Sequence, residues 1–236
     1  RTDVHSEVKT LLDGLKLNTV CEDARCPNIW ECWGKHRTAT MMILGDTCTR
    51  NCRYCSVKSG RPDRLPDPEE PDNVAEAVHR LGLRHAVITS VDRDDLPDFG
   101  SDHFVKTIEA IRRKSPTCAV ELLIPDFGGD PASLERVLQA KPNVLGYNTE
   151  TVPRLYKRMR SKGQYVQTLQ ILKQADAFRR DHGISMGTKT GLMMGLGETV
   201  DEVLAVMDDL RSVNCDVLTM GQYLNPTQKH APVARF

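Results

Sequence analysis

The sequence predicts an α/β fold in which six strands and their connecting helices form a partial (β/α)6 barrel. From residue 39 onward, short apolar segments alternate with amphipathic segments of helical period. Cysteine and polar residues gather just after several of the apolar segments. Barrel enzymes build their sites from many strand ends, whereas an open doubly wound sheet concentrates its ligand at one switch point. We therefore favour the barrel over the open sheet.

The predicted strands are short apolar or β-branched runs at residues 39–45, 85–91, 118–124, 144–149, 185–193 and 217–223. The predicted helices have apolar residues at helical spacing and cover residues 72–82, 102–114, 131–139, 164–180 and 199–213. Residues 59–71 contain four prolines and many charges, which indicates a solvated connector. We expect residues 1–36 to form an N-terminal arm and residues 37–236 to form the barrel, with a C-terminal tail missing.

The composition is that of an ordinary globular protein. Of 236 residues, 39% are hydrophobic and 27% are charged, and 32 basic residues balance 32 acidic ones. This zero net charge gives no global field that would favour nucleic acid or a membrane surface, so neither is expected as a partner. No apolar stretch approaches the ~18 residues of a membrane span, and no signal-peptide pattern is present. We expect a cytoplasmic protein, or one of an organelle matrix if the gene is eukaryotic.

Three cysteines follow the first predicted strand, in the string CTRNCRYC at Cys48, Cys52 and Cys55. A four-iron cluster ordinarily takes four thiolates, so three would leave one iron open to another ligand. Tyr54 precedes the last cysteine and could cover one side of the site. A zinc site completed by a distant ligand is the alternative, although zinc sites usually contain two C-x2-C pairs.

A second set of three cysteines lies in CEDARCPNIWEC, at Cys21, Cys26 and Cys32. Trp30 and Trp33 flank the last of them and could shield a metal cluster from water. The alternatives are one disulfide with a spare thiol, or simple packing. Reduced cytosolic thiols favour metal binding over the disulfide.

The string CTRNCRYC resembles the C-x3-C-x-aromatic-C motif of the radical SAM superfamily, with Tyr54 at the aromatic position. The resemblance implies a partial (β/α)6 barrel of the radical SAM type. It also implies a [4Fe–4S] cluster on the three cysteines. The open iron would be chelated by the amino and carboxylate groups of S-adenosyl-L-methionine, whose reductive cleavage gives a 5′-deoxyadenosyl radical.

The two cysteine sets in this order resemble the lipoyl synthase family. The likeness extends through TSVDRDDLPD, ELLIPDF, NTETVPRLY, GLMMGLGE and MGQYLNPT. It implies a sulfurtransferase that inserts two sulfur atoms at C6 and C8 of a protein-bound octanoyl-lysine. The implied sulfur source is an auxiliary [4Fe–4S] cluster on Cys21, Cys26 and Cys32. That family takes a fourth ligand from a serine in an Arg-Ser-Ser-Tyr motif, whereas no serine follows Ser212 here.

The same resemblance implies the partners. They are octanoylated lipoyl carrier domains, such as dehydrogenase E2 subunits or the glycine cleavage H protein, and an electron donor of the ferredoxin or flavodoxin type. The rival hypotheses are another radical enzyme with an extra cluster, such as a methylthiotransferase or a biotin-synthase-like protein, and a zinc-stabilised binding module without catalysis.

Several polar residues near strand ends are candidates for contacts with S-adenosylmethionine. The resemblance implies that Thr89 and Ser90 hold its ammonium group. Asn148 and Glu150 alternate with Thr149, so their side chains should point the same way, and ribose hydroxyls are a sensible partner. Arg160 and Lys189 are candidates for the methionine carboxylate. The full candidate set is Tyr54, Thr89, Ser90, Asn148, Glu150, Arg160 and Lys189.

The segment GLMMGLGET at 191–199 is not a dinucleotide fingerprint, because Val200 stands where that motif needs glycine. We expect its glycines to let the backbone approach adenine, or to form a tight turn with Glu198. Cys118 and Cys215 lie apart from both cysteine sets, and we expect them to pack as small apolar side chains.

Overall fold

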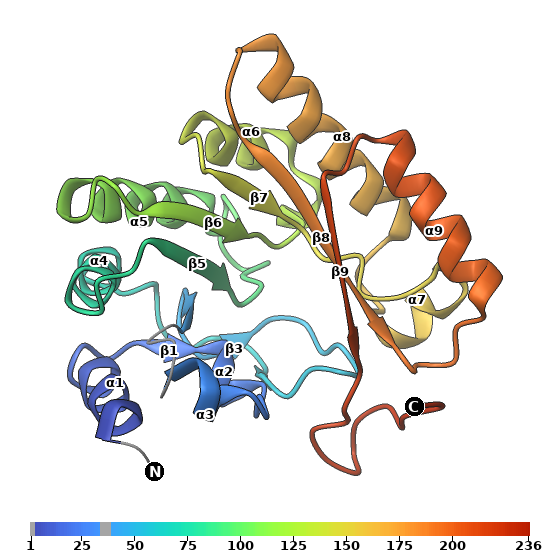
Figure 1. Ribbon diagram of the computed structural model, residues 1–236, viewed down its shortest axis with the longest axis horizontal. Coiled ribbons are helices and arrows are strands. Elements are labelled where there is room, and N and C mark those ends of the chain that lie inside the picture. Colours follow the sequence, from blue (N-terminus) through green and yellow to red (C-terminus); the bar gives the residue numbers. More distant parts are fainter. Residues whose placement is uncertain (1–2, 34–38) are drawn as a thin grey trace.

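Seven strands of the described chain form one curved sheet (Figure 1). The computed structural model describes residues 3–33 and 39–236. The strands of this sheet are β1 (Asn18–Thr19), β2 (Thr40–Ile43), β5 (His85–Ser90), β6 (Ala119–Leu123), β7 (Val144–Gly146), β8 (Gly187–Met194) and β9 (Val217–Gln222). The two-residue β1 is antiparallel to β2, and every other pair is parallel.

The strands follow one another across the sheet in chain order, β1-β2-β5-β6-β7-β8-β9. A doubly wound sheet would reverse its order at a switch point, and this sheet does not. Among the described strands β9 pairs with β8 alone, so the barrel is partial. The prediction of an α/β partial barrel is confirmed.

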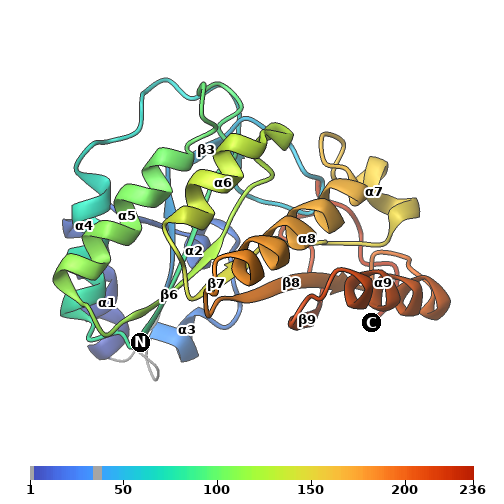
Figure 2. The ribbon, with the colours of Figure 1, turned by 90° about the horizontal axis from the view of Figure 1, so that it is seen from above.

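Helices cover the convex side of the sheet, and Figure 2 shows α5, α6 and α8 as neighbours along it. The connecting helices are α4 (Glu70–Arg80), α5 (Ser101–Lys114), α6 (Pro131–Gln139), α7 (Pro153–Met159), α8 (Tyr165–Asp181) and α9 (Val200–Ser212). No helix of the described residues is both long enough and apolar enough to cross a bilayer.

Local sequence explains where several of these helices begin. Asp130 caps α6 by accepting a hydrogen bond from the backbone N–H of Ser133, and Pro131 occupies the first turn. Thr199 and Glu202 form a capping box at the start of α9, each satisfying a backbone N–H of the other. These caps fix the residues at which α6 and α9 begin, and so the ends of the loops that precede them.

The N-terminal arm packs on the start of the sheet. It contains α1 (Asp3–Gly14), β1, α2 (Val20–Asp23) and α3 (Ile29–Glu31). Val8, Leu12 and Trp33 are fully buried in the same apolar cluster as the first strands and α4 to α6. The predicted arm boundary at residue 36 lies outside the described residues.

Candidate active site

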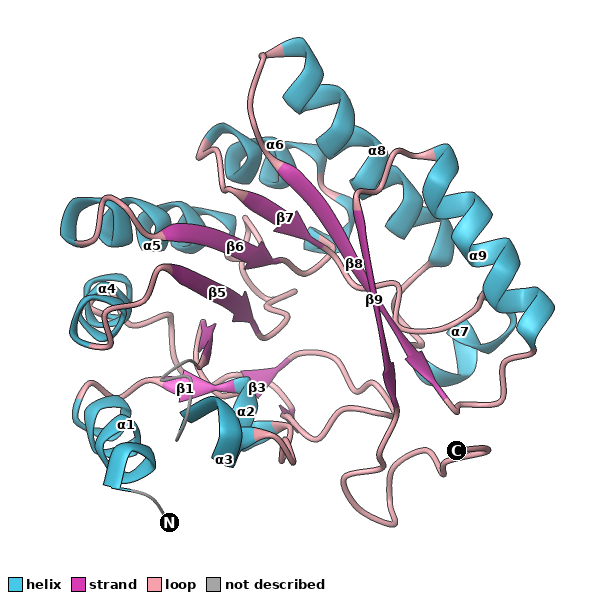
Figure 3. Cartoon of the chain, viewed as in Figure 1, coloured by secondary structure: helices cyan, strands magenta, loops and turns pink. Residues whose placement is uncertain are grey.

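The three cysteines of CTRNCRYC lie in a loop held at both sides by backbone hydrogen bonds. The loop begins at β3 (Thr47–Cys48), which pairs in parallel with β4 (Lys58–Ser59). Arg53 donates its N–H to the carbonyl of Met159 at the end of α7, at 2.9 Å, and accepts from the N–H of Ala231 at 2.8 Å. In Figure 3 the arrowheads of β5, β6 and β7 point toward this side of the molecule.

A cavity of about 220 Å³ lies between this loop and the carboxyl ends of the strands. Its lining includes all three cysteines of the loop and six of the seven predicted cofactor-contacting residues. These are Cys48, Cys52, Cys55, Tyr54, Thr89, Ser90, Asn148, Glu150 and Arg160. Val20 and Ala24 of the arm also line it, which the sequence did not indicate. Residues from the arm, the cysteine loop, β5, the segment after β7 and the end of α7 therefore converge on one cavity.

Burial raises the pKa of all three thiols in the loop. It raises the pKa of Cys48 to about 12, with the nearby Asp92 carboxylate adding to the effect, and that of Cys55 to about 11. The pKa of Cys52 is raised for the same reason. Without metal these thiols hold their protons near neutral pH, so a metal must displace protons to bind them.

No group of three or more histidine, cysteine or acidic side chains in the described residues is gathered as ligands of a single metal ion. The thiolates of a four-iron cluster each bind a different iron, so they lie further apart than the ligands of one zinc ion. For Cys48, Cys52 and Cys55 the case against zinc therefore rests on their spacing, C-x3-C-x2-C, which lacks the two C-x2-C pairs usual in zinc sites.

Two polar atoms beside the cysteines lack hydrogen-bond partners among the described residues. They are Ser90 Oγ and Asp92 Oδ1, both buried and both in residues that line the cavity, and Asp92 Oδ1 has only an ion-pair contact, 3.3 Å from Arg50 Nε. The Thr89 hydroxyl donates to the carbonyl of Leu123 at 2.8 Å and keeps its lone pairs as acceptors. Buried polar atoms without partners are costly, so this corner fits a ligand with hydrogen-bond donors, such as an ammonium group.

Asn148 and Glu150 reach the cavity because the chain after β7 continues alongside β8. Glu150 donates its N–H to the carbonyl of Gly191 at 2.8 Å and accepts from the N–H of Met193 at 2.9 Å. Glu150 has a φ of 68°, a strained conformation for a non-glycine residue that the flanking hydrogen bonds maintain. Gly191 leaves room for the Asn148 amide in this position, because a Cβ there would lie 2.8 Å from Asn148 Oδ1.

Arg160 supplies a buried positive charge at the same wall. Its guanidinium lies 4.9 Å from the centre of the Tyr147 ring and donates to the carbonyl of Asn148 at 3.1 Å. Burial raises the pKa of Glu150, and the charge of Arg160 opposes that rise. An arginine held in this way can pair with a ligand carboxylate.

Lys189 is the one predicted contact residue that the structure does not bring to the cavity lining. Lys189 pairs with Gly146, which pairs with Leu123, so Lys189 lies on the cavity-facing side of the sheet. Its ammonium nevertheless lies 2.7 Å from the carboxylate of Glu121. Glu121 comes two residues before Leu123 in β6, so this ion pair lies further from the carboxyl end of the strand. A carboxylate within the sheet therefore pairs with this half-buried lysine without a ligand.

The arm cysteines also lie near one another. Cys21 is in α2, Cys26 accepts and donates backbone hydrogen bonds in the following turn, and Cys32 caps α3. Burial raises the pKa of Cys32, and the neighbouring Cys21 and Cys26 add to the rise. All eight cysteines are free thiols, so the disulfide alternative is wrong for this structure.

The two tryptophans beside Cys32 pack on α1. The ring of His5 stacks on Trp30 at 4.3 Å and is tilted toward Trp33 at 5.1 Å. Trp33 is fully buried, whereas Trp30 is 52% exposed. Only Trp33 is therefore enclosed, and Trp30 covers His5 on the outer surface.

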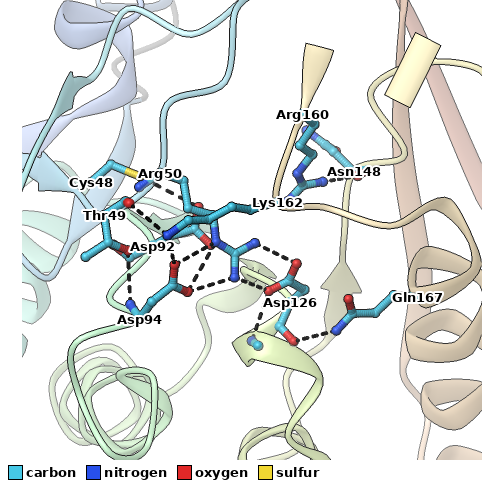
Figure 4. A network of polar contacts seen from close by, with 11 residues as sticks. Cys48, Thr49, Arg50, Asp92, Asp94, Asp126, Asn148, Arg160, Lys162 and Gln167 are labelled. Carbon is cyan, nitrogen blue, oxygen red and sulfur yellow. Dashed lines mark hydrogen bonds and ion pairs between the residues drawn. The ribbon is translucent and has the colours of Figure 1, made fainter. Parts of the chain in front are cut away.

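Sequence reasoning missed the residue that connects the cysteine loop to the strand ends. Arg50 lies between Cys48 and Cys52 and contacts the carboxylates of Asp94 and Asp126 (Figure 4). A single arginine between two cysteines has the pattern of an ordinary loop residue. Its partners, Asp94 and Asp126, are brought to it only by the register of β5 and β6. Its burial gives no signal in the sequence.

Comparisons with known proteins agree with this fold. The family model described as the radical SAM superfamily matches residues 42–210. Among solved structures, methylornithine synthase superposes with a TM-score of 0.61 at 13% identity, over 100% of this chain and 68% of that one. SuiB of Streptococcus suis bound to S-adenosylmethionine gives a TM-score of 0.63 at 13% identity, over 98% and 53%. Fold and family model together define a radical SAM protein.

The curated relatives are more specific. Lipoyl synthase of Rubrobacter xylanophilus is 53% identical over 98% of this chain and 70% of the relative. Lipoyl synthase of Caldanaerobacter subterraneus is 51% identical over 98% of this chain and 79% of the relative. The chain belongs to the lipoyl synthase family within the radical SAM superfamily. That membership implies an enzyme that uses a [4Fe–4S] cluster and S-adenosylmethionine and acts on an octanoylated carrier protein.

Proposed function

We propose that this chain inserts two sulfur atoms, at C6 and C8, into an octanoyl-lysine carried by a lipoyl domain. The observation that carries the proposal is the cavity at which Cys48, Cys52 and Cys55 meet two buried acceptor atoms, Ser90 Oγ and Asp92 Oδ1, that have no hydrogen-bond donor among the described residues. Three thiols provide one ligand fewer than a four-iron cluster takes, and the acceptors suit a cosubstrate that completes it.

In this proposal the loop cysteines hold the radical-generating cluster, and Cys21, Cys26 and Cys32 hold a second, sulfur-donating cluster. When bound, the first cluster and S-adenosylmethionine supply a 5′-deoxyadenosyl radical, which can take hydrogen atoms from unactivated C–H bonds. The two cysteine sets belong to one region, since Val20 beside Cys21 lines the cavity and the Ser56 hydroxyl donates to the carbonyl of Asp23.

The remaining side chains bind and orient the cosubstrate. Ser90, Asp92 and Thr89 accept hydrogen bonds from the ammonium group, and Arg160 pairs with the carboxylate. Asn148 and Glu150 hold the ribose hydroxyls, and Tyr54 covers the side of the site next to Cys52. Met42, Val57, Leu123 and Ile124 line the same cavity with apolar surface, which excludes water from a reactive species.

The proposed partners follow from this chemistry. The acyl chain arrives on a lipoyl carrier domain, either a dehydrogenase E2 subunit or the glycine cleavage H protein. A ferredoxin or flavodoxin supplies the electron. Free thiols of this number require a reducing compartment, for which we propose the cytoplasm.

The test is a single turnover with an octanoylated carrier peptide and protein whose clusters carry 34S-labelled sulfide. We expect 5′-deoxyadenosine and a lipoyl peptide containing 34S. A variant with Cys21, Cys26 and Cys32 replaced by alanine should still cleave S-adenosylmethionine and form no lipoyl product. Lipoyl product with unlabelled sulfur, or undiminished product from the variant, would refute the assigned sulfur source. Absence of S-adenosylmethionine cleavage would refute the proposed function itself.

A further inference from the structure

We propose that Arg50 is a positioning residue that fastens the Cys48–Cys55 loop to the ends of β5 and β6 and so holds the thiols in place for the cluster. This inference rests on the proposed function. It goes beyond that function by assigning the geometry of the cluster site to a residue that lines the cavity and supplies no thiolate to the cluster.

The guanidinium of Arg50 binds two carboxylates that come from different strands (Figure 4). Its Nε donates to Asp94 Oδ2 at 3.1 Å, and its Nη2 donates to Asp94 Oδ1 at 2.8 Å. Its Nη1 donates to Asp126 Oδ2 at 2.6 Å, and its Nη2 also reaches Asp126 Oδ1 at 2.5 Å. Asp94 follows β5 and Asp126 follows β6, so one side chain joins the cysteine loop to two strand ends.

Further contacts link this arginine to a cluster ligand. The backbone N–H of Arg50 donates to Cys48 Sγ at 3.4 Å, and Cys48 Sγ lies 3.6 Å from Asp92 Oδ2. Arg50 Nε also lies 3.3 Å from Asp92 Oδ1. Thr49 reinforces the attachment, because its N–H and its hydroxyl both donate to the carbonyl of Asp92 at 3.0 Å.

The carboxylates are themselves held by their surroundings. Asp126 accepts the N–H of Gly128 at 3.0 Å, and its carbonyl accepts from Gln167 of α8 at 3.4 Å. The side chain of Asp126 is 2% exposed and that of Arg50 is 5% exposed. A buried bidentate pair such as Arg50–Asp126 has one preferred geometry, so the position of β6 constrains the position of the cysteine loop.

The chain offers a matched control on the same carboxylate. Lys162 Nζ lies 3.4 Å from Asp94 Oδ2 and 3.4 Å from the carbonyl of Thr49, and its side chain is 58% exposed. Removing this cation removes the same charge from Asp94. It leaves the buried hydrogen bonds from Arg50 to Asp94 and Asp126 intact. An exposed ion pair such as Lys162–Asp94 contributes little to stability.

The test uses a parent protein in which Cys21, Cys26 and Cys32 are alanine, so that all bound iron reports on the loop. Arg50→Lys keeps the charge, but a single ammonium group cannot make bidentate hydrogen bonds to both Asp94 and Asp126. We expect it to release iron to a chelator at least about tenfold faster than the parent, as for other groups that orient metal ligands. The metal-free protein should melt at nearly the parent's temperature, and Lys162→Gln should stay within about twofold of the parent.

A second variant covers the case in which Arg50→Lys does not fold. Arg50→Gln combined with Asp126→Asn removes both charges of the buried pair, so no unpaired charge remains at position 126. It should also release iron at least about tenfold faster. An unchanged release rate in either folded variant would overturn the inference while leaving the proposed function in place. A parent protein that takes up no iron would overturn the proposed function and this inference with it.

Discussion

At the scale of single residues, the cavity wall depends on the strained backbone of Glu150 and on the room that Gly191 leaves for Asn148. Glu150 holds a left-handed φ of 68° because its N–H and carbonyl are both bonded to β8. Strain of this kind costs about 1–3 kcal/mol and persists where the surroundings over-determine it. Gly191 gives Asn148 the room to lie beside it. Together they direct an amide and a carboxylate into the same cavity.

Gly191→Ala should therefore disturb the cosubstrate site without unfolding the protein. A Cβ at Gly191 would lie 2.8 Å from Asn148 Oδ1, so the Asn148 amide has to move. We expect S-adenosylmethionine to bind the cluster-loaded protein about tenfold more weakly, which is about 1.4 kcal/mol. Isothermal calorimetry measures this directly. Gly187→Ala is the control, since its Cβ would make only ordinary contacts, with Val144 at 3.7 Å and with the carbonyl of Asn143 at 3.9 Å. An equal loss there would contradict the account.

Arg160 and Lys189 are distinguished by the same measurement. Arg160 lines the cavity, so Arg160→Gln should weaken S-adenosylmethionine binding by about 2 kcal/mol, the typical value of a hydrogen bond to a charged group. Lys189 is paired with Glu121, so Lys189→Gln should leave the affinity unchanged. A larger loss for Lys189→Gln than for Arg160→Gln would reverse the assignment.

The sequence predicted the residues that meet at the cavity better than it predicted their individual partners. Asn148 and Glu150 were expected to share one side because strand side chains alternate, and the structure brings both to the cavity. Lys189 was also expected there, but Glu121 on β6 takes its charge. The Arg50 contacts could not be anticipated either, since they depend on which carboxylates the register of β5 and β6 brings together.

At the scale of elements, long amphipathic segments were predicted closely, and the short ones were not. The predicted helices at 102–114 and 131–139 correspond to α5 and α6 within one residue, because each has an apolar stripe buried against the sheet. The seven-residue α7 is absent from the predicted helix ranges, although the basic residues of RLYKRMR are expected on a solvated helix face. The structure also buries Leu155, Tyr156 and Met159 of this helix. The two-residue strands β3 and β4 have no periodicity to detect.

The capping box of α9 predicts a pH dependence of stability. Hydrogen bonds from Arg154, at 2.6 and 2.8 Å, are the main cause that lowers the pKa of Glu202 from its ordinary 4.5 to about 2. A carboxyl whose pKa is lower in the folded state stabilises the protein above its unfolded pKa. That stabilisation is lost as the pH falls from about 4.5 to about 2.

Glu202→Gln keeps a side chain that can complete the capping box but removes the charge. We expect its melting temperature to fall below that of the parent near neutral pH and to match it near pH 2. Thermal unfolding followed by circular dichroism measures both. Glu135→Gln on α6 is the control, because Glu135 accepts a hydrogen bond from Gln139 and has no ion pair among the described residues. A Glu202→Gln deficit that persists near pH 2 would contradict the assigned cause.

At the scale of the whole molecule, one partial barrel brings together groups from distant parts of the chain. The arm, the cysteine loop and the ends of β5, β6 and β7 all contribute to a single cavity. Alternation of strands and helices predicted the barrel, because each unit buries one face on the next. How the arm packs was not predictable, since a two-residue strand and short helices carry little pattern. Its placement follows from the burial of Val8, Leu12 and Trp33.

The most direct test of the account is the electron paramagnetic resonance spectrum of the reduced protein with Cys21, Cys26 and Cys32 replaced by alanine. Three loop thiols should hold about four irons per chain, and one of those irons should be open. We predict a cluster signal that changes when S-adenosylmethionine is added. A signal that is identical with and without S-adenosylmethionine would contradict the claim that the cosubstrate occupies the cavity at an open iron.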